Sequence, residues 1–180
     1  MERFRVLQES EIECRVKQVM ERGAVILLYK TARTDMDLLD ETVGAENWQC
    51  DYKEIKGNLY CGIGVRIGED KPYVWKWDCG IESREDEDGN QKKGEASDSF
   101  KRAGFKWGIG RELYTAPFIW IPADKLSVEK REYQGKTRWV TRDTFCVEKI
   151  AYDDTRRMTG LALRNEKTHK RVFVWERGQA

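Results

Sequence analysis

One stretch, residues 92–114, limits the folds open to this chain more than any other. It reads KKGEASDSFKRAGFKWGIGRELY, and a helix over 94–107 would align four apolar residues on one face: Ala96, Phe100, Ala103 and Trp107. Such a stripe must pack against another element, because burying apolar surface is the main driving force of folding. Gly108 and Gly110 end the predicted helix, since glycine adopts the left-handed conformation without steric cost.

Three segments with the alternation of β-strands precede this helix, over 48–56, 59–67 and 73–79. The Gly57-Asn58 dipeptide is suited to a tight hairpin between the first two. The second segment places apolar side chains on one face and bare Gly62 and Gly64 on the other. Mid-strand glycines mark the close approach of another element, and we expect the 94–107 helix there.

The N-terminal third is predicted to hold a short helix over 1–9 and a hairpin over 12–29, whose second arm, AVILLY, is buried. Thr34 is expected to cap a helix with Met36, Leu39 and Val43 turned inward and Gly44 as its end. The carboxylates of this helix fit an exposed first turn that complements the helix dipole better than a magnesium site.

The C-terminal part reads as a charged loop over 123–138 followed by strands over 139–150, 158–164 and 171–175, and 82–93 reads as an acidic, exposed excursion. The predicted class is therefore α+β: an antiparallel sheet with a strand-strand-strand-helix core and a basic helix packed across it. We expect a single domain over 1–180, with its core at about 31–114 and further strands over 139–175.

Charge is unevenly distributed along the chain although its net charge is only +1. Residues 31–58 carry seven acidic and three basic side chains, whereas 101–142 carry ten basic and four acidic ones. A neutral chain with such blocks can present a cationic groove on one side and an acidic surface on another. This arrangement also suits head-to-tail self-association.

Several kinds of chemistry are disfavoured by what the sequence lacks. The five cysteines form no CxxC pair, and with His169 as the only histidine neither a zinc site nor a nucleophile with its usual base is expected. There is no GxxxxGK[ST] loop and no GxGxxG. No apolar run reaches about 20 residues, and the N-terminus is too charged for a secretory signal. We expect a cytoplasmic protein with no cofactor, metal or membrane partner.

The 92–114 stretch resembles the signature helix of the Rad-fifty-two superfamily of single-strand annealing proteins, and most closely the bacteriophage branch often called Sak. Three further stretches are similar to that branch: TARTDMDLLDETVGAENWQ at 31–49, LYCGIGVRIG at 59–68 and VWKWDCG at 74–80. The resemblance covers about 31–114. The chain departs from it at Gly104, where most relatives carry alanine, and glycine inside a helix costs about 1 kcal/mol.

The resemblance implies a cationic groove for single-stranded DNA. It assigns phosphate contacts first to Lys101 and Arg102, then to Arg33 and Lys106. Arg111 is a weaker candidate, because it could instead donate to a carbonyl at the helix end. Lys76 and Arg66 share the polar face of the predicted strands, where a solvated sheet surface would explain them equally well. The DNA path is the alternative to the helix as the neighbour of Gly62 and Gly64. Four tryptophans fit core packing better than base stacking: Trp48, Trp75, Trp77 and Trp107.

The resemblance implies a non-enzymatic, ATP-independent annealing protein of recombination and repair, encoded by a phage or prophage and acting in the bacterial cytoplasm. Relatives form rings or helical filaments, and it leaves open a host single-strand-binding protein or a phage exonuclease as partner. Lysine and arginine bind phosphates without reading bases, which leaves the bases free to pair. Two alternatives remain: a single-strand protector that does not anneal, and an RNA-binding or purely structural oligomeric module.

Overall fold

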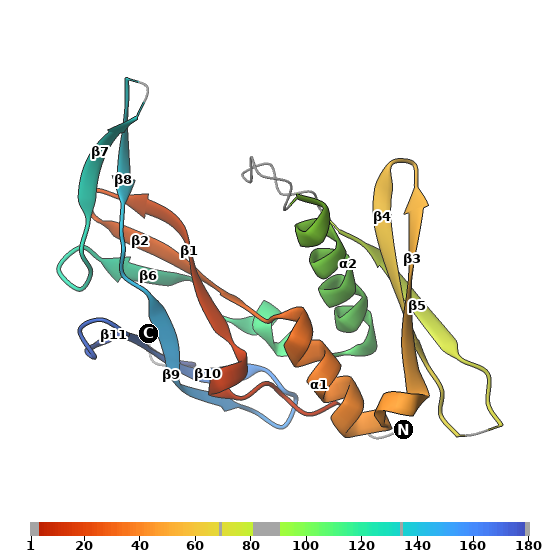
Figure 1. Cartoon of the computed structure of the whole chain (residues 1–180). Helices are drawn as coiled ribbons and strands as arrows, with labels where there is room; N and C mark the ends of the chain where they lie inside the picture. The colour runs from red at the N-terminus through yellow and green to blue at the C-terminus, as the bar shows by residue number, and fades with distance from the viewer. Residues whose placement is uncertain (1–3, 69, 81–90, 134, 179–180) are drawn as a thin grey trace. The chain divides into compact units, whose positions relative to one another are not determined.

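The computed structural model describes residues 4–68, 70–80, 91–133 and 135–178, which contain two α-helices and eleven β-strands (Figure 1). The strands pair in antiparallel fashion, which confirms the α+β class. The chain divides into two compact units, one from Met1–Val6 and Lys30–Arg111, the other from Leu7–Tyr29 and Glu112–Ala180. That the two belong to one domain stays a prediction.

The first unit contains a three-stranded sheet in the order β3-β4-β5, with β3 at Trp48–Ile55, β4 at Asn58–Val65 and β5 at Val74–Cys79. Helix α2 (Gln91–Trp107) packs across β4 and β5, as Figure 1 shows. Phe100 and Ala103 on the predicted stripe are at most 1% exposed, so the expected inner face is confirmed. Gly108 and Gly110 follow with φ of 101° and 73° and end the helix as predicted.

The hairpin between β3 and β4 turns one residue earlier than expected. Ile55 pairs with Asn58, so the two-residue turn is Lys56-Gly57 rather than Gly57-Asn58. Both turn residues have positive φ, 53° and 76°, as a type I′ turn requires. Lys56 accepts this unusual conformation because the turn's twist matches that of the strands it joins.

The bare face of β4 is covered by tryptophans rather than by the helix. Cys61 and Ile63 on the opposite face are fully buried, as predicted. A Cβ at Gly62 would lie 2.5 Å from the indole of Trp77, which faces away from α2. The expectation of a helix against this glycine was therefore wrong, because side chains of the paired strand β5 fill the space.

Helix α1 (Ala32–Val43) begins three residues earlier than the sequence suggested. Its cap is Thr31, whose Oγ1 accepts a hydrogen bond from the backbone N of Thr34 at 3.1 Å. Met36 is not turned inward but is 38% exposed, whereas Leu39 is buried as expected. Gly44 ends the helix, as predicted. The short 3-10 turn η2 (Ala45–Asn47) leads into β3.

The second unit is a six-stranded sheet in the order β11-β10-β9-β1-β2-β6. Its strands are β1 (Glu13–Met20), β2 (Gly23–Tyr29), β6 (Ile119–Pro122), β9 (Phe145–Tyr152), β10 (Met158–Asn165) and β11 (Arg171–Glu176). The predicted 12–29 hairpin is confirmed, and β2 is its buried arm. The predicted helix over 1–9 is wrong within the described residues 4–8, which form no helix; a 3-10 turn, η1, spans Glu9–Glu11.

The charged segment 123–138 is not a plain loop. It contains most of a separate hairpin of β7 (Glu129–Tyr133) and β8 (Lys136–Val140). Its side chains are charged on both faces, so the alternation that identifies a half-buried strand is absent. The single strand expected over 139–150 is divided between β8 and β9. In the acidic excursion expected over 82–93, residues 82–90 lie outside the described ranges, and the backbone from Gln91 onward is already helical.

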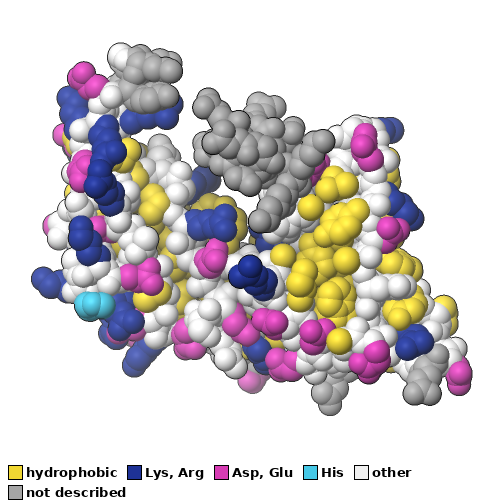
Figure 2. Space-filling view, in the orientation of Figure 1, with side chains coloured by type: hydrophobic (Ala, Val, Ile, Leu, Met, Phe, Trp, Pro, Cys, Tyr) yellow, Lys and Arg dark blue, Asp and Glu magenta, His cyan; other side chains and the backbone are white. Residues whose placement is uncertain are grey.

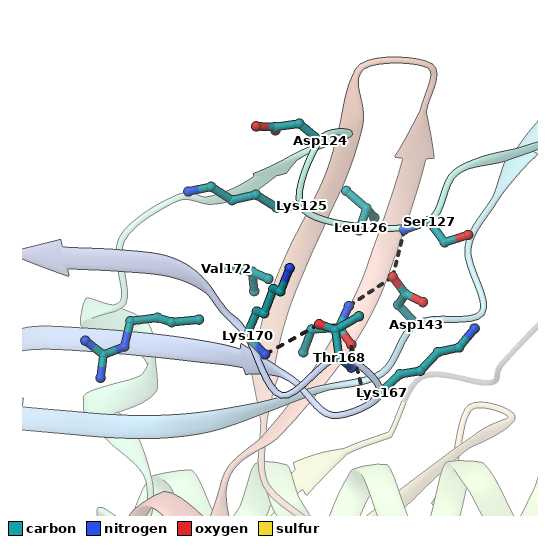
Figure 3. Close-up of a pocket in the computed structure, with 11 residues that line it drawn as sticks. Asp124, Lys125, Leu126, Ser127, Asp143, Lys167, Thr168, Lys170 and Val172 are labelled. Carbon is teal, nitrogen blue, oxygen red and sulfur yellow. Dashed lines mark hydrogen bonds between the residues drawn. The ribbon is translucent and has the colours of Figure 1, made fainter.

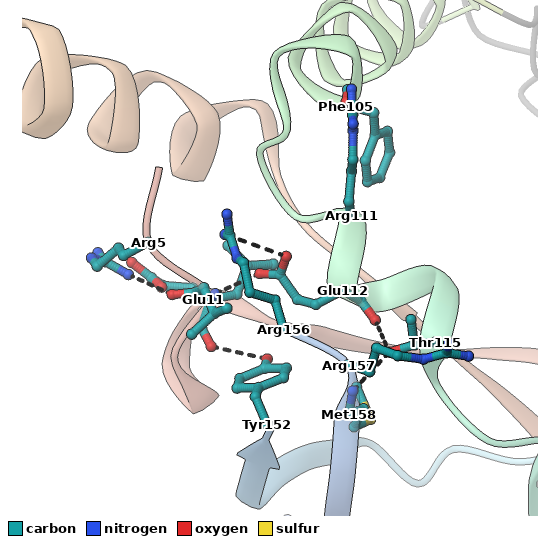
Figure 4. A network of polar contacts seen from close by, with 12 residues as sticks. Arg5, Glu11, Phe105, Arg111, Glu112, Thr115, Tyr152, Arg156, Arg157 and Met158 are labelled. Atoms are coloured by element: carbon teal, nitrogen blue, oxygen red, sulfur yellow. Dashed lines mark hydrogen bonds and ion pairs between the residues drawn. The ribbon is translucent and has the colours of Figure 1, made fainter. Parts of the chain in front are cut away.

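A buried carboxylate joins three parts of the second unit (Figure 4). Glu112, in the 3-10 turn η3 (Arg111–Thr115), is 2% exposed and accepts a hydrogen bond from the backbone N of Leu7 at 2.7 Å. Arg156 lies 3.9 Å from its other oxygen. Thr115 adds a link by accepting from the backbone N of Met158 at 2.8 Å. These contacts attach the turn to the segment before η1 and to β10.

A hollow of about 430 Å³ lies beside the turn between β10 and β11 (Figure 3). At its base Asp143, 5% exposed, accepts hydrogen bonds from the backbone N of Ser127 at 2.7 Å and from Asn165 Nδ2 at 3.0 Å. Lys167 and Lys170 are among the lysines and arginines that line it. The carboxylate holds three chain segments together at this point.

Candidate nucleic-acid interface

Helix α2 is fixed on its sheet by aromatic contacts in the middle and at the C-terminal end of its apolar stripe. Trp107 Nε1 donates to the backbone O of Ile63 at 2.9 Å, and the rings of Trp48 and Phe100 meet edge to face at 6.1 Å. Trp48 and Trp107 therefore pack between helix and sheet, as predicted. Because the stripe faces the sheet, the basic residues of α2 lie on its flanks and outer surface.

Four cationic side chains lie where the C-terminal half of α2 crosses β5, two of them beside one carboxylate and two at the helix end. We name the group of Lys76, Asp78, Arg102, Lys106 and Arg111 the Asp78 cluster. Arg102 Nη2 and Lys106 Nζ lie 3.6 and 3.7 Å from the two carboxylate oxygens of Asp78. Lys106 Nζ also donates to the backbone O of Trp77. The cluster carries a surplus of positive charge.

Two members of the cluster are held at the C-terminal end of the helix. Lys76 Nζ and Arg111 Nη2 both donate to the backbone O of Lys106, at 3.0 and 2.8 Å, and Arg111 Nε donates to Phe105 O at 2.6 Å. The helix end carries partial negative charge, which favours cations there. Arg111 thus makes the carbonyl contacts that were its alternative role.

Of Lys76 and Arg111, Lys76 is the more buried side chain. Its ammonium lies 4.2 Å from the ring centroid of Trp107. Burial, with a smaller contribution from nearby Arg111, lowers the pKa of Lys76. An ammonium in this position already interacts with the helix end and with the indole face, so it is less suited to bind a ligand.

Arg102 and Lys106 are the members best placed to meet an anion. Their side chains are 39% and 50% exposed, against 19% for Asp78. Arg102 Nε is buried and makes no hydrogen bond among the described residues. Both cations share one carboxylate, so neither has a full counter-charge of its own. A phosphate would complete the pairing that Asp78 provides only in part.

Lys101, the neighbour of Arg102, makes contacts in another direction. Its side chain is 17% exposed and lies 3.6 Å from Asp98, and its backbone O accepts from Lys30 Nζ at 3.2 Å. Consecutive helix residues are about 100° apart, so adjacent cations leave the helix in different directions. Lys101 is therefore turned toward the Lys30 side of α2, and Arg102 toward β5.

Arg33 and Arg66 lie outside the Asp78 cluster. Arg33 is exposed in the first turn of α1 rather than before the helix, and its side chain makes no hydrogen bond or ion pair within the described residues. Arg66 follows β4, donates to Asn47 Oδ1 at 3.2 Å and lies 5.4 Å from the ring centroid of Tyr73. Arg66 and Lys76 therefore do not share one polar face of the sheet, as was expected, but lie at two separate places.

A buried ion pair beneath α2 was not predicted. Lys30 Nζ lies 2.5 Å from both carboxylate oxygens of Asp35, and the two residues are 2% and 0% exposed. Burial raises the pKa of Asp35 to about 6, against the opposing effect of Lys30. Asp35 is thus not an exposed first-turn carboxylate. Its one sequence signal is Gly104, where a Cβ would lie 2.6 Å from Asp35 Oδ2.

On the face drawn in Figure 2, the described lysines and arginines of the first unit are interspersed with aspartates and glutamates. The described residues hold no group of three or more His, Cys, Asp or Glu side chains that could bind a metal ion. No helix in the described ranges has the length and apolar character needed to cross a membrane.

No family model, curated protein or solved structure matches this chain.

Proposed function

We propose that this chain is an ATP-independent protein that binds single-stranded DNA and anneals complementary strands in recombination and repair, a phage or prophage member of the Rad-fifty-two superfamily. Its support from sequence is the set of motifs over 31–114. Its support from geometry is one observation: half-buried Arg102 and exposed Lys106 share the single carboxylate of Asp78 on the edge strand β5.

Phosphate is the anion class that this arrangement fits best. Arginine and lysine contact phosphate oxygens without reading base edges, so a strand held in this way is bound regardless of its sequence. With a net charge of only +1, the chain offers no general attraction for nucleic acid, and binding depends on the local cluster. The proposal includes assembly into a ring or filament that places the clusters of successive copies in line.

The first experiment measures affinity for a single-stranded oligonucleotide at several salt concentrations. Arg102→Ala/Lys106→Ala should bind more weakly, with a salt slope reduced by about 0.7 for each phosphate that the variant no longer neutralises. Lys101→Ala should weaken binding less than Lys106→Ala, because Lys101 is only 17% exposed and already lies near Asp98. Lys17→Ala/Arg22→Ala, two exposed cations of the second unit, is the charge-matched control.

A second arm of this experiment changes affinity in the opposite direction. Asp78→Asn removes the negative charge that competes with phosphate, while Asn keeps the oxygen that accepts from the backbone N of Cys79 at 2.9 Å. Affinity should rise several-fold. Asp37→Asn, an exposed change of equal charge in α1, should leave it nearly unchanged. If the folded Arg102→Ala/Lys106→Ala and Asp78→Asn proteins bind DNA with unaltered affinity, the Asp78 cluster is not the DNA-binding site.

The alternative function is a single-strand protector, and one kinetic measurement separates the two. Two complementary oligonucleotides, one carrying a fluorophore and the other a quencher, are mixed with and without the protein. An annealing protein speeds duplex formation, whereas a protector slows it. A protein that binds the strands and slows pairing would contradict the annealing function while leaving the DNA interface in place.

A further inference from the structure

The face of the three-stranded sheet opposite α2 carries a row of three aromatic side chains. On β5, Lys76 and Asp78 contact α2, so Trp75 and Trp77 face the other way. The rings of Trp75 and Trp77 stack with centroids 5.6 Å apart and planes 24° apart, and Tyr73 meets Trp75 at 6.4 Å. We name Tyr73, Trp75 and Trp77 the aromatic row.

The neighbouring strand β4 is bare beneath this row. Gly62 pairs with Trp77 and Gly64 with Trp75. A Cβ at these positions would lie 2.5 and 2.8 Å from the respective indole rings, closer than real side-chain contacts allow. The two glycines therefore let both indoles rest directly on the strand. All three aromatic residues are partly exposed, unlike the fully buried residues under α2.

Cations flank both ends of the row. Lys53 Nζ, from β3, lies 4.3 Å from the ring centroid of Trp77, and the guanidinium of Arg66 lies 5.4 Å from that of Tyr73. The side chain of Lys53 is 57% exposed, and its ammonium lies 3.8 Å from the carboxylate of exposed Asp51. Aromatic faces flanked by cations are a chemistry that suits a flat, electron-rich ring attached to an anion.

The row and the Asp78 cluster meet on the same strand. Asp78 follows Trp77 directly, and Lys106 of the cluster donates to the backbone O of Trp77. Because β5 is an edge strand, a ligand can contact both faces of it by crossing one edge. Phosphates on the cluster side and bases on the tryptophan side would occupy the two positions together.

We propose that the aromatic row stacks unpaired bases of the DNA strand whose phosphates the Asp78 cluster binds. The inference rests on the proposed function and adds a surface that contacts the faces of the bases, while their pairing edges stay free for a second strand. It also reassigns Trp75 and Trp77, which the sequence had placed in the core. Base–aromatic stacking changes affinity by about 5- to 150-fold per base and tolerates any sequence, because every base has a π-face.

The test compares two ligands of equal length and charge: an oligothymidylate, and an oligomer of the same sugar-phosphate backbone in which the bases are absent. The wild-type protein should bind the base-bearing strand at least about tenfold more tightly, and its tryptophan fluorescence should be quenched only by that strand. Trp75→Leu/Trp77→Leu should lose this preference and keep its affinity for the abasic strand. Trp139→Leu/Trp175→Leu, in the second unit, should keep the preference.

Each result has a distinct meaning. If the wild-type protein binds both strands equally and with a normal salt slope, the stacking inference is overturned and the proposed function remains. If it binds neither strand, the proposed function itself fails. The wild-type comparison needs no variant, so it holds even where Trp75→Leu/Trp77→Leu does not fold. A folded double variant that loses a self-associated state and keeps the preference would assign the row to contact with a second copy, which also overturns the inference.

Discussion

Gly104 is explained by the carboxylate that lies against it. Within a helix this glycine costs about 1 kcal/mol relative to alanine. The structure supplies the reason for that cost, because the site where a Cβ would stand is 2.6 Å from Asp35 Oδ2 and 3.4 Å from Lys30 Nζ. A small residue in α2 thus permits a buried ion pair between α2 and the start of α1.

Gly104→Ala should destabilise the protein by about 1–3 kcal/mol, because the clash outweighs the gain in helix propensity. The measurement is the free energy of unfolding in denaturant. Gly94→Ala, in the same helix but with no atom within 4 Å of its Cβ position, should instead stabilise by up to about 1 kcal/mol.

A double-mutant comparison attributes the effect to the ion pair. In a Lys30→Met/Asp35→Ala background the carboxylate is gone, and Gly104→Ala should there become neutral or stabilising. A penalty of equal size in both backgrounds would mean that the glycine is required by something other than Asp35.

At this scale the sequence indicates which residues are basic but not the direction in which they point. Lys101 and Arg102 are adjacent in the sequence and were predicted as a pair, yet one lies near Asp98 and the other near Asp78. The burial of Asp35 could not be predicted either, since its partner Lys30 belongs to the segment before the helix. Such pairings depend on tertiary packing, which local patterns do not encode.

Elements with one buried face were the ones that the sequence predicted well. Strands β1 and β4 repeat with a period of two, the inner stripe of α2 has helical spacing, and β2 is a continuous apolar run; each was found close to its expected position. The hairpin of β7 and β8 was missed because neither of its faces is apolar. Strand β11 was predicted almost to the residue.

The polar turn between β10 and β11 is held by Asp143 and Asn165. Asn165 Oδ1 accepts from the backbone N of Lys167 and Thr168 at 2.9 and 3.1 Å, while its Nδ2 donates to Asp143. The carboxylate therefore fixes the turn through Asn165 and the segment before β7 through Ser127. A buried acceptor that serves two donors is costly to remove.

Asp143→Ala should lower the free energy of unfolding by about 1–3 kcal/mol, because two donors lose their acceptor in a buried place. Thermal unfolding followed by circular dichroism measures it. Asp124 lines the same hollow but is more exposed, so Asp124→Ala is the control. It should change the free energy of unfolding by less than about 0.5 kcal/mol. Equal effects of the two changes would contradict a structural role for Asp143.

At the scale of the whole molecule, the edge strand β3 is the most exposed strand of the first unit. Seven of its eight residues are exposed, and Tyr52 and Ile55 retain 41% and 46% of their surface. An exposed edge strand with apolar side chains is a template for pairing with another chain. We expect this strand to form the contact between neighbouring copies in the proposed ring or filament.

Light scattering of the purified protein should therefore give a mass many times that of the 21.2 kDa chain. Tyr52→Lys should reduce that mass, because a lysine on an edge strand opposes pairing. The matched control is Val174→Lys on β11, an edge strand of the six-stranded sheet. Val174 is 59% exposed. A wild-type monomer would contradict the assembly, and a reduced mass only in Val174→Lys would move the contact to β11.

The path of the chain between the two units bears on how the protein is made. The chain leaves the second unit after Tyr29 and re-enters it at Glu112, so β2 finds its partner β6 only about ninety residues later. During synthesis, residues 30–111 emerge from the ribosome before the later strands of the second unit. The first unit can therefore fold while the hairpin of β1 and β2 still has an unpaired edge. Contacts between residues so distant in sequence form slowly, and a waiting hairpin of this kind is a natural client for chaperones.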